Sequence, residues 1–346
     1  MVRFEIAGRP IGGARCFVIA EAGVNHNGDL ARAIEMIDVA AEAGADAIKF
    51  QTFRAALVAA AAAPMAEYQK ATGAKSQLDM LRELELDRDA HVVLAAHAAS
   101  RGIAFLSTPF DDPSADMLAE LGMVAFKVAS GEVTNTPFLA RIAAFGRPMI
   151  VSTGMADLTE VAQAVACLQA NGAPPFALLH CVSLYPAPAP TANLRAMDTL
   201  RARFGAPVGY SDHTLGTHVA LAAVGLGAEI LEKHFTLSRA LPGPDHAASL
   251  EPDELRRMIR ELREIESALG DGVKAPNPLE AEMIRVARRS LVAARDLAKG
   301  QTLTAADFVA LRPGGGVEPA RLSGLVGRAA PEALPAGSPV PRSWLV

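Results

Sequence analysis

The first candidates for chemistry are two polar clusters that follow apolar runs. Glu232, Lys233 and His234 come after the apolar run that starts at Ala228, and His213 comes after an earlier one. A charge inside a protein core is costly unless it is paired, hydrogen-bonded or bound to a metal. If both histidines end neighbouring strands, about 4.8 Å apart, their imidazoles can share one divalent ion and leave positions open for water and substrate. Two hydrogen-bonding histidines without a metal are the alternative.

Two lysines and a glycine-containing turn suggest that the ligand is an anion. Lys49 and Lys127 each end an apolar run with no acidic residue beside them. The segment Ser152-Thr153-Gly154 lies between an apolar run and a helical segment, where glycine allows backbone N–H groups to approach an anion. Together these residues predict a site for a phosphate and a carboxylate. A surface ion pair is the alternative for either lysine taken alone.

The elements that must position these residues follow from the hydrophobic period. Eight short runs, rich in β-branched and aromatic residues, alternate with segments of helical period; the runs span 16–20, 47–50, 103–106, 124–128, 149–152, 176–180, 207–210 and 228–232. Eight such units in about 250 residues predict a closed (β/α)8 TIM barrel, whose active site lies at the C-terminal ends of the strands. A doubly wound sheet is the alternative, but neither GxGxxG nor GxxxxGK[ST] is present.

Every one of the eight predicted strands ends in polar residues. Exposure to solvent can explain one polar strand end. It is a poor explanation for eight polar strand ends that converge on one rim of a barrel. The residues at these ends are Glu21, Asn25, Lys49, Gln51, Ser107, Thr108, Lys127, Ser130, Glu132, Ser152, Thr153, His180, Ser183, Tyr185, Ser211, Asp212, His213, Glu232, Lys233 and His234.

Local signals mark several further elements. Residues 2–14 indicate a hairpin, Gly44 indicates the end of a helix, and Asp157 with Glu160 forms a capping-box pattern at the start of another. An insertion at residues 54–86 contains the polar, turn-rich stretch "EYQKATGAKSQ". Such a stretch is typical of an active-site lid, and a plain surface excursion is the alternative.

The chain is expected to hold two domains. Residues 1–270 would form the catalytic barrel with its N-terminal hairpin, and residues 271–284, which include "DGVKAPNPLE", would form a linker. Residues 285–346 carry short strands and many turns and predict a small, mostly-β domain.

Composition narrows the class of protein. The 346 residues are 51% hydrophobic and 21% charged, with a net charge of −5, which predicts a globular protein whose main partner is not nucleic acid. The three cysteines show no CxxC spacing, so neither a disulfide framework nor a thiolate zinc site is indicated. No signal peptide and no membrane span are expected, and the predicted location is cytoplasmic.

Nine motifs together resemble one enzyme family. They are "IAEAGVNHNG", "AIKFQTF", "FLSTPFD", "FKVASGE", "IVSTGM", "LLHCVSLYP", "GYSDHTLG", "LEKHFT" and "GPDHAASLEPDE". In this order they resemble the sialic acid synthase (N-acetylneuraminate synthase) family, from about residue 15 to the C-terminus. The last segment resembles the antifreeze-like (SAF) domain of these enzymes.

The resemblance implies a transferase that condenses phosphoenolpyruvate with an N-acetylated mannose-type sugar to give a nine-carbon 2-keto acid and phosphate. It implies a divalent ion on His213 and His234, most often Mn2+, with Mg2+ or Co2+ as alternatives. The phosphoenolpyruvate carboxylate would bind Lys49, Thr108, Lys127 and Ser211, its phosphate Lys127, Ser130, Ser152 and Ser183, and the sugar Glu21, Gln51, Tyr185, Asp245 and Arg312.

Catalytic roles and assembly also follow from the resemblance. An ionised Glu132 can stabilise positive charge at C2 of phosphoenolpyruvate, and Glu21 or Asp245 can handle the protons. Arg312, in the small domain, would reach the barrel of the partner subunit, so the resemblance implies a homodimer with a swapped domain. Ser183 stands where some members of the family carry Asn, so the family's phosphate contact at this position does not transfer fully. The basic segment from Arg285 to Arg289 stands where some members carry an aromatic residue, so the family's sugar selectivity does not transfer fully either.

The acceptor first expected is N-acetylmannosamine, which would give N-acetylneuraminate. The alternatives are legionaminic or pseudaminic acid synthesis from diacetamido-trideoxy sugars, and a sialic acid 9-phosphate synthase, which would need a cationic pocket for a second phosphate. A Schiff-base aldolase that uses Lys127 or Lys49 as nucleophile is a rival on the same fold. A non-catalytic carbohydrate-binding protein is a rival of another class.

Overall fold

The computed structural model describes residues 4–13, 15–60, 63–65, 74–172 and 175–345. The stretch 66–73, which holds most of the turn-rich part of the predicted lid, lies outside these residues. The chain divides into two compact units, Met1–Gly270 and Asp271–Val346, and each is described by itself.

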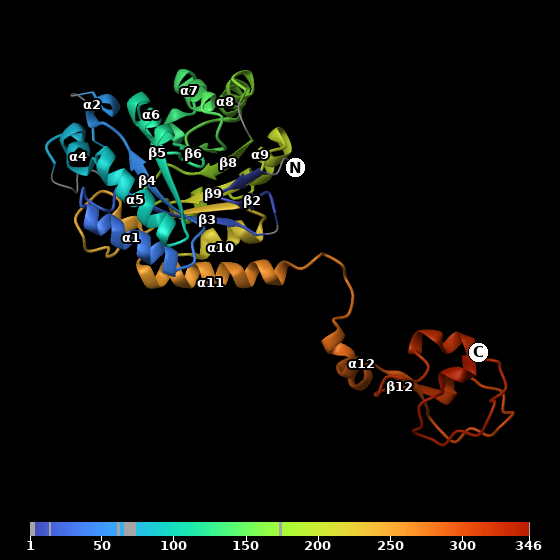
Figure 1. The fold of residues 1–346 in the computed structure, drawn as a ribbon. Coiled ribbons are helices and arrows are strands. Elements are labelled where there is room, and N and C mark those ends of the chain that lie inside the picture. The colour runs from blue at the N-terminus through green and yellow to red at the C-terminus, as the bar shows by residue number, and fades with distance from the viewer. Residues whose placement is uncertain (1–3, 14, 61–62, 66–73, 173–174, 346) are drawn as a thin grey trace. The chain divides into compact units, whose positions relative to one another are not determined.

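The first unit is built on an eight-stranded parallel sheet, ordered β5-β4-β3-β10-β9-β8-β7-β6 (Figure 1). The edge strands β5 and β6 also contact each other, so the sheet closes on itself. The predicted TIM barrel is thereby confirmed. Its strands are β3 Phe17–Gly23, β4 Ala47–Thr52, β5 Ala104–Pro109, β6 Phe126–Val128, β7 Met149–Ser152, β8 Phe176–Cys181, β9 Val208–Asp212 and β10 Ile230–His234.

Helices surround the strands (Figure 1). They are α1 Leu30–Glu42, α5 Arg88–Ser100, α6 Asp112–Glu120, α7 Thr136–Ala144, α8 Leu158–Ala170, α9 Ala196–Phe204, α10 His218–Gly225 and α11 Pro252–Leu269, with the short η1 Ser130–Glu132, η2 Ala189–Thr191 and η3 His246–Ala248. The predicted capping box of Asp157 and Glu160 starts α8. Gly44 follows α1 with φ +83°, a conformation that glycine adopts without strain.

Within its described residues, the insertion between β4 and α5 contains the helices α2 Ala55–Val58 and α4 Gln77–Leu84. Ser76 caps α4 by accepting a hydrogen bond from the Asp79 N–H. Met80 and Leu84 of α4 pack with Val24 and Phe53 in an apolar cluster separate from the main core. The described part of the insertion is therefore packed against the rim of the barrel.

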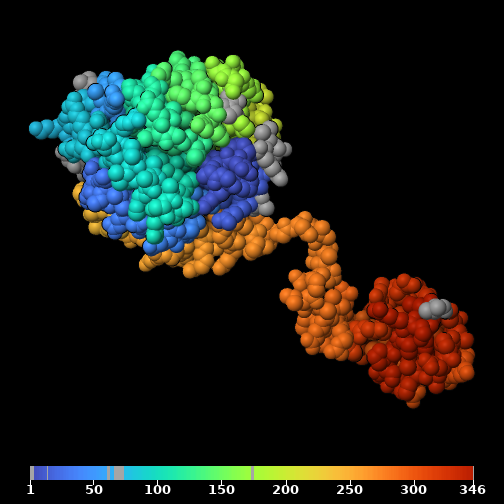
Figure 2. All heavy atoms as spheres, viewed as in Figure 1, coloured from blue at the N-terminus to red at the C-terminus, as the bar shows by residue number. Residues whose placement is uncertain are grey.

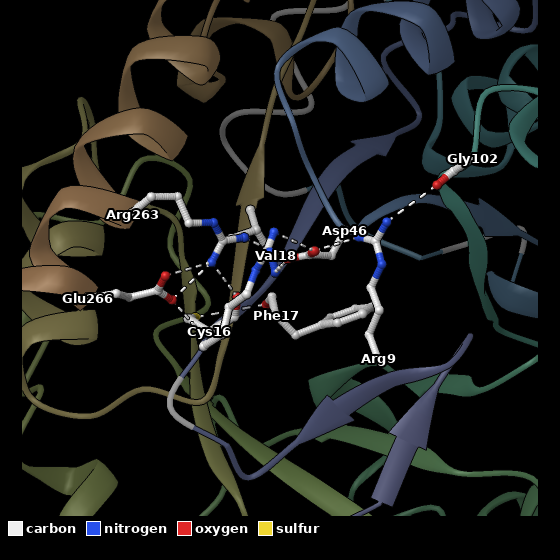
Figure 3. A network of polar contacts seen from close by, with 9 residues as sticks. Arg9, Cys16, Phe17, Val18, Asp46, Gly102, Arg263 and Glu266 are labelled. Atoms are coloured by element: carbon white, nitrogen blue, oxygen red, sulfur yellow. Dashed lines mark hydrogen bonds and ion pairs between the residues drawn. The ribbon is translucent and has the colours of Figure 1, made fainter.

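The N-terminal ends of the strands are closed by the predicted hairpin, β1 Phe4–Ile6 and β2 Arg9–Ile11. Its Ile6 and Ile11 are fully buried in the main core. Asp46, just before β4, binds both Arg9 of the hairpin and Arg263 of α11, and it accepts the Val18 N–H of β3 at 2.8 Å (Figure 3). This network links the hairpin, two strands and α11 at the end opposite to the polar rim.

The space-filling view shows α11, in orange, lying along the outside of the first unit (Figure 2). Its apolar stripe of Leu255, Met258, Ile259 and Leu262 is buried against the barrel, as the period of an amphipathic helix requires. Within the described residues, none of the helices combines the length and the apolarity that a membrane crossing needs.

The second unit has a small core of its own, which includes Leu291, Leu325, Val340 and Trp344. Its two antiparallel strands are β11 Ser290–Ala293 and β12 Phe308–Leu311, and its helices are η4 Pro278–Glu280, α12 Ala281–Ala287, η5 Ala305–Asp307, η6 Pro319–Gly324 and η7 Arg342–Leu345. The segment 271–284, predicted as a linker, thus contains η4 and the start of α12. A capping box between Asn277 and Glu280 begins this helical stretch.

Candidate functional site

A cavity of about 410 Å³ opens at the C-terminal ends of the barrel strands. This volume lies within the usual range of small-molecule sites. The rim candidate Glu232 lines it, and so do thirteen residues with a role implied by the resemblance, namely Glu21, Lys49, Gln51, Thr108, Lys127, Ser130, Ser152, Ser183, Tyr185, Ser211, His213, His234 and Asp245. The alternation of a β-strand places residues two apart on the same face, which explains why Lys49 and Gln51 of β4 both reach the cavity.

Two buried lysines form the floor of this cavity. The Lys49 ammonium lies 2.7 Å from the Glu21 carboxylate and donates to Thr108 Oγ1 at 3.0 Å. The Lys127 ammonium donates to Ser152 Oγ at 2.6 Å, and burial lowers its pKa. Because both ammonium groups are desolvated, an incoming anion meets cations that water does not screen.

Glu232 stands between the two lysines. Its carboxylate oxygens lie 3.8 Å from each ammonium, and Oε1 accepts a hydrogen bond from Ser211 at 3.0 Å. Burial opposes ionisation of this carboxyl, but Lys127, Lys49 and the hydrogen bond from Ser211 act in the other direction, and its pKa is lowered. Glu232 is therefore the ionised carboxylate of the cavity floor.

The carboxyl groups of Glu21 and Asp245 differ from that of Glu232, because their pKa values are raised. Burial raises the pKa of Glu21 to about 7, although the nearby Lys49 acts in the other direction. Burial also raises the pKa of Asp245 to about 6. Groups with such values can exchange a proton near neutral pH, which is what general acid–base chemistry requires.

Hydroxyl groups and one backbone N–H gather at the ends of β6, β7 and β8. The Gly154 N–H donates to Ser130 Oγ at 3.0 Å. A Cβ added at Gly154 would lie 2.5 Å from Ser183 Oγ and 2.9 Å from both Cys181 Sγ and Ser130 Oγ. Glycine is required here because these side chains close in on its Cα, and together they make a compact polar pocket beside Lys127.

The two histidines predicted as metal ligands lie side by side, with ring centroids 5.5 Å apart. His213 donates its Nδ1–H to the Val182 carbonyl at 2.6 Å, so its Nε2 carries the lone pair. His234 is buried, its Nδ1 has no hydrogen-bond partner, and Asp245 Oδ2 lies 3.8 Å away. An unsatisfied imidazole nitrogen beside a second imidazole is a donor set that suits a divalent transition metal.

Among the described residues, no group of three or more His, Cys, Asp or Glu side chains is arranged to hold a metal. A metal bound here would therefore have the two imidazoles as its protein ligands and open positions for other donors. Tyr185, whose ring centroid lies 4.2 Å from that of His213, borders the same place.

Two residues with an implied role do not line the cavity, and neither do the rim candidates Asn25, Ser107, Thr153, His180, Asp212 and Lys233. Glu132 is half-buried in η1, accepts a hydrogen bond from Asn135 at 2.7 Å, and does not line the cavity, although Gly131 beside it does. Arg312 is exposed on the second unit, which is described by itself.

Sequence reasoning placed Glu232 on the polar rim but gave it no role in binding or catalysis, although the alternation of β10 indicates that it faces the same way as His234. Glu232 and His234, two residues apart, both line the cavity. Lys233 between them pairs with Asp212 at 2.7 Å and with the Thr214 carbonyl, and it does not line the cavity. The three titratable residues at the end of this strand thus have two separate surroundings.

One side of the cavity is apolar, which the sequence did not indicate. It is lined by Val24 after β3, Phe110 after β5, and Met80, Leu81 and Leu84 of α4. The described part of the insertion therefore forms part of the cavity through α4.

Comparison with known proteins agrees with this geometry. The model of the NeuB family matches residues 36–274, and the model of the SAF domain matches residues 288–345. The chain belongs to the NeuB family. Membership confirms the resemblance seen in the nine motifs, the antifreeze-like domain, and the prediction of an enzyme of the synthase class.

Two curated relatives of this NeuB-family chain carry the same name. The N,N'-diacetyllegionaminic acid synthase of Campylobacter jejuni is 48% identical over 320 residues, which cover 91% of this chain and 96% of that protein. The N,N'-diacetyllegionaminic acid synthase of Legionella pneumophila is 46% identical over 329 residues, which cover 93% of this chain and 92% of that protein.

A solved structure of a related enzyme superposes on the chain. It is the N-acetylneuraminic acid (sialic acid) synthetase of Leptospira borgpetersenii, with a TM-score of 0.73 and 38% identity, covering 82% of this chain and 95% of that chain. Legionaminic acid synthases and a sialic acid synthetase are thus both among the relatives of this protein.

Proposed function

We propose that the protein condenses phosphoenolpyruvate with a diacetamido-trideoxy sugar to give N,N'-diacetyllegionaminic acid and phosphate. The observation that carries the choice of product is the 48% and 46% identity to two legionaminic acid synthases, against 38% to the sialic acid synthetase. N-acetylmannosamine, the acceptor first expected from the sequence, is therefore the second candidate.

The polar floor of the cavity supports phosphoenolpyruvate as one substrate. Lys49, Thr108 and Ser211 would hold its carboxylate together with Lys127. Ser130, Ser152 and Ser183 would hold its phosphate, with the second contact of Lys127. This assignment needs two desolvated cations and several hydroxyl donors in one place, as the cavity floor has. Hydrogen bonds between a lysine ammonium group and a carboxylate or phosphate are stronger than those between neutral groups.

The histidine pair would hold a divalent ion, with Mn2+ as the first choice. When bound, such an ion supplies Lewis-acid polarisation of the carbonyl oxygen of the acceptor. Glu21, Gln51, Tyr185 and Asp245 would contact the acceptor itself. In this arrangement the acceptor aldehyde lies near His213 and His234, and phosphoenolpyruvate lies deeper, on the lysines.

The reaction then follows from the charges of the floor. The methylene carbon of phosphoenolpyruvate attacks the aldehyde carbon, and positive charge develops at C2 of phosphoenolpyruvate. Glu232, which is ionised and buried, would stabilise that charge, the role first assigned to Glu132. Water adds at C2 and gives up one proton, which replaces the proton used on the new hydroxyl group. The C2–O bond to phosphate then breaks, its electron pair and the C2 hydroxyl proton leave with phosphate, and C2 becomes the keto carbon. Glu21, with a pKa of about 7, can supply the proton to the new hydroxyl group.

A phosphate-release assay tests this proposal. The full-length protein receives phosphoenolpyruvate, Mn2+ and, separately, the diacetamido-trideoxy sugars that lead to legionaminic and pseudaminic acid, N-acetylmannosamine, and its 6-phosphate. The highest kcat/KM is expected with the precursor of legionaminic acid. A higher value with any other sugar would replace the acceptor but leave the phosphoenolpyruvate chemistry in place.

Trapping with borohydride separates this chemistry from a Schiff-base aldolase. No adduct on Lys49 or Lys127 is expected, because both ammonium groups are engaged in ion pairs and hydrogen bonds. A pyruvyl or sugar adduct on either lysine, detected by mass spectrometry, would favour the aldolase.

A further inference from the structure

The apolar side of the cavity, here called the acceptor wall, consists of Val24, Met80, Leu81, Leu84 and Phe110. Val24 comes directly after β3 and Phe110 directly after β5, so the wall stands beyond the strand ends that carry Glu21, Lys49 and Thr108. Met80 and Leu84 are held in a buried cluster with Phe53, whose ring meets that of Phe110 edge to face at a centroid distance of 6.2 Å. The wall is thus a packed surface with fixed side chains.

The strand order places this wall across the barrel mouth from His213, Ser183 and Ser152, whereas His234, on β10, lies next to β3. In the closed order β5-β4-β3-β10-β9-β8-β7-β6, the strands β5, β4 and β3 lie opposite β9, β8 and β7. The latter three carry His213, Ser183 and Ser152 at or just after their ends. An acceptor whose aldehyde carbon lies on the His213 side of the histidine pair therefore extends its far carbons across the mouth toward the acceptor wall.

The chemistry of the acceptor wall distinguishes between sugars. Its side chains offer no hydrogen-bond donor or acceptor apart from the weak thioether of Met80. A hydroxyl or phosphate group that is pressed against it loses water without gaining a partner, whereas a methyl group gains contacts. The wall therefore fits a sugar whose terminal carbon is a methyl group better than one whose terminal carbon carries oxygen.

We propose that the acceptor wall selects a terminally deoxygenated sugar, and that Leu81 is its principal specificity residue. This inference rests on the proposed function and adds the physical cause of the sugar choice. Leu81 is the suitable probe because it lines the cavity and is only half-buried, whereas Met80 and Leu84 are buried. Its replacement changes the surface that faces the sugar with little disturbance of the packing beneath.

The test compares Leu81→Asn with the wild-type protein, since asparagine keeps the branched shape of leucine and adds polar atoms. Leu78→Asn is the matched control, because Leu78 is also half-buried in α4 but does not line the cavity. The measurement is the ratio of kcat/KM for the diacetamido-trideoxy sugar to kcat/KM for N-acetylmannosamine, at saturating phosphoenolpyruvate and Mn2+. Thermal melting checks that each variant is folded.

The ratio is expected to exceed one in the wild type and to fall by about tenfold in Leu81→Asn, the size of effect that one apolar contact has in a specificity pocket. KM for phosphoenolpyruvate should stay unchanged, and Leu78→Asn should keep the wild-type ratio. Met80→Gln provides a second variant should Leu81→Asn fail to fold, and its ratio should fall in the same direction.

Three outcomes would overturn the inference, and they differ from one another. In the first outcome, the wild type prefers the diacetamido sugar, and neither Leu81→Asn nor Met80→Gln alters this preference. The proposed function then stands, but the acceptor wall is not the cause of the preference. An equal fall in Leu78→Asn shows a general effect of α4. A wild type that prefers N-acetylmannosamine, or that uses neither sugar, overturns the proposed function and the inference together.

Discussion

The three titratable residues at the end of β10 have different surroundings. Glu232 and His234 face the cavity, and Lys233 forms a buried pair with Asp212 outside it. The pair satisfies a buried ammonium group that would otherwise be costly. One carboxylate and one imidazole of this strand therefore line the cavity, and the lysine serves the packing around them.

Replacing the carboxylate between the lysines tests its role. Glu232→Gln keeps the shape and the hydrogen bond from Ser211 but removes the negative charge, so kcat is expected to fall by about 10²–10³, as when one group that stabilises a developing charge is lost. Phosphate release at saturating substrates measures this. Glu132→Gln is the comparison, and a larger loss of kcat there would assign the role to Glu132.

Metal dependence should follow the histidine pair. Chelation is expected to abolish turnover, and Mn2+ should restore it, because two adjacent imidazoles with free lone pairs favour a divalent ion. His213→Ala and His234→Ala should each weaken Mn2+ binding in calorimetry with the isolated protein. His97→Ala is the control, since His97 pairs with Asp38 on the helices outside the cavity. Unchanged binding in both cavity variants would place the metal elsewhere.

At the scale of elements, side-chain hydrogen bonds and ion pairs stabilise the short helices of the second unit. In the second unit, η5 is closed by Asp307, which accepts the Thr304 N–H at 2.7 Å and pairs with Arg295 at 2.6 Å. These contacts favour the charged carboxylate: the Thr304 N–H first, then Arg295, lower the pKa of Asp307.

This lowered pKa predicts how the second unit responds to acid. A carboxyl with a depressed folded-state pKa contributes stability above its unfolded value, about 3.9, and loses it as pH falls through the folded value. Asp307→Asn should therefore lower Tm clearly at pH 7 and progressively less below about pH 4. Trp344 is the single tryptophan of the chain and is buried in this unit, so its fluorescence reports the transition.

Glu318→Gln is the control for this measurement, because Glu318 is largely exposed and lies 3.8 Å from Arg342. Exposed ion pairs contribute little, about 0–1 kcal/mol, so its Tm should follow that of the wild type at all pH values. A Tm difference for Asp307→Asn that does not shrink in acid would contradict the role of its charge.

For the whole molecule, we propose that two subunits complete each other's sites, with Arg312 of one subunit reaching the sugar in the barrel of the other. The guanidinium is suited to donate to a neutral carbonyl such as that of an N-acetyl group. Arg312→Ala and His234→Ala should each be nearly inactive alone. After subunit exchange, the mixture should regain about a quarter of wild-type activity, since half of the dimers are mixed and each holds one complete site.

Native mass spectrometry of differently tagged variants confirms that exchange has occurred. Exchange without any return of activity would mean that Arg312 acts on the barrel of its own subunit. A protein that ends at Gly270 should still bind phosphoenolpyruvate and Mn2+, because the residues assigned to both ligands lie in the first unit.

Much of the fold and most of the site could be predicted from the sequence because both depend on local patterns. The eight apolar runs, the capping box at Asp157 and the polar residues at the strand ends all lie within a few positions of the elements they mark. Other features depended on the tertiary structure. Glu232 gains its place only when β4 and β6 bring Lys49 and Lys127 to it, and Met80 and Leu81 become a wall only because α4 packs beside Val24 and Phe110. These contacts join residues distant in sequence, and their geometry comes from barrel closure and packing, which no local period encodes.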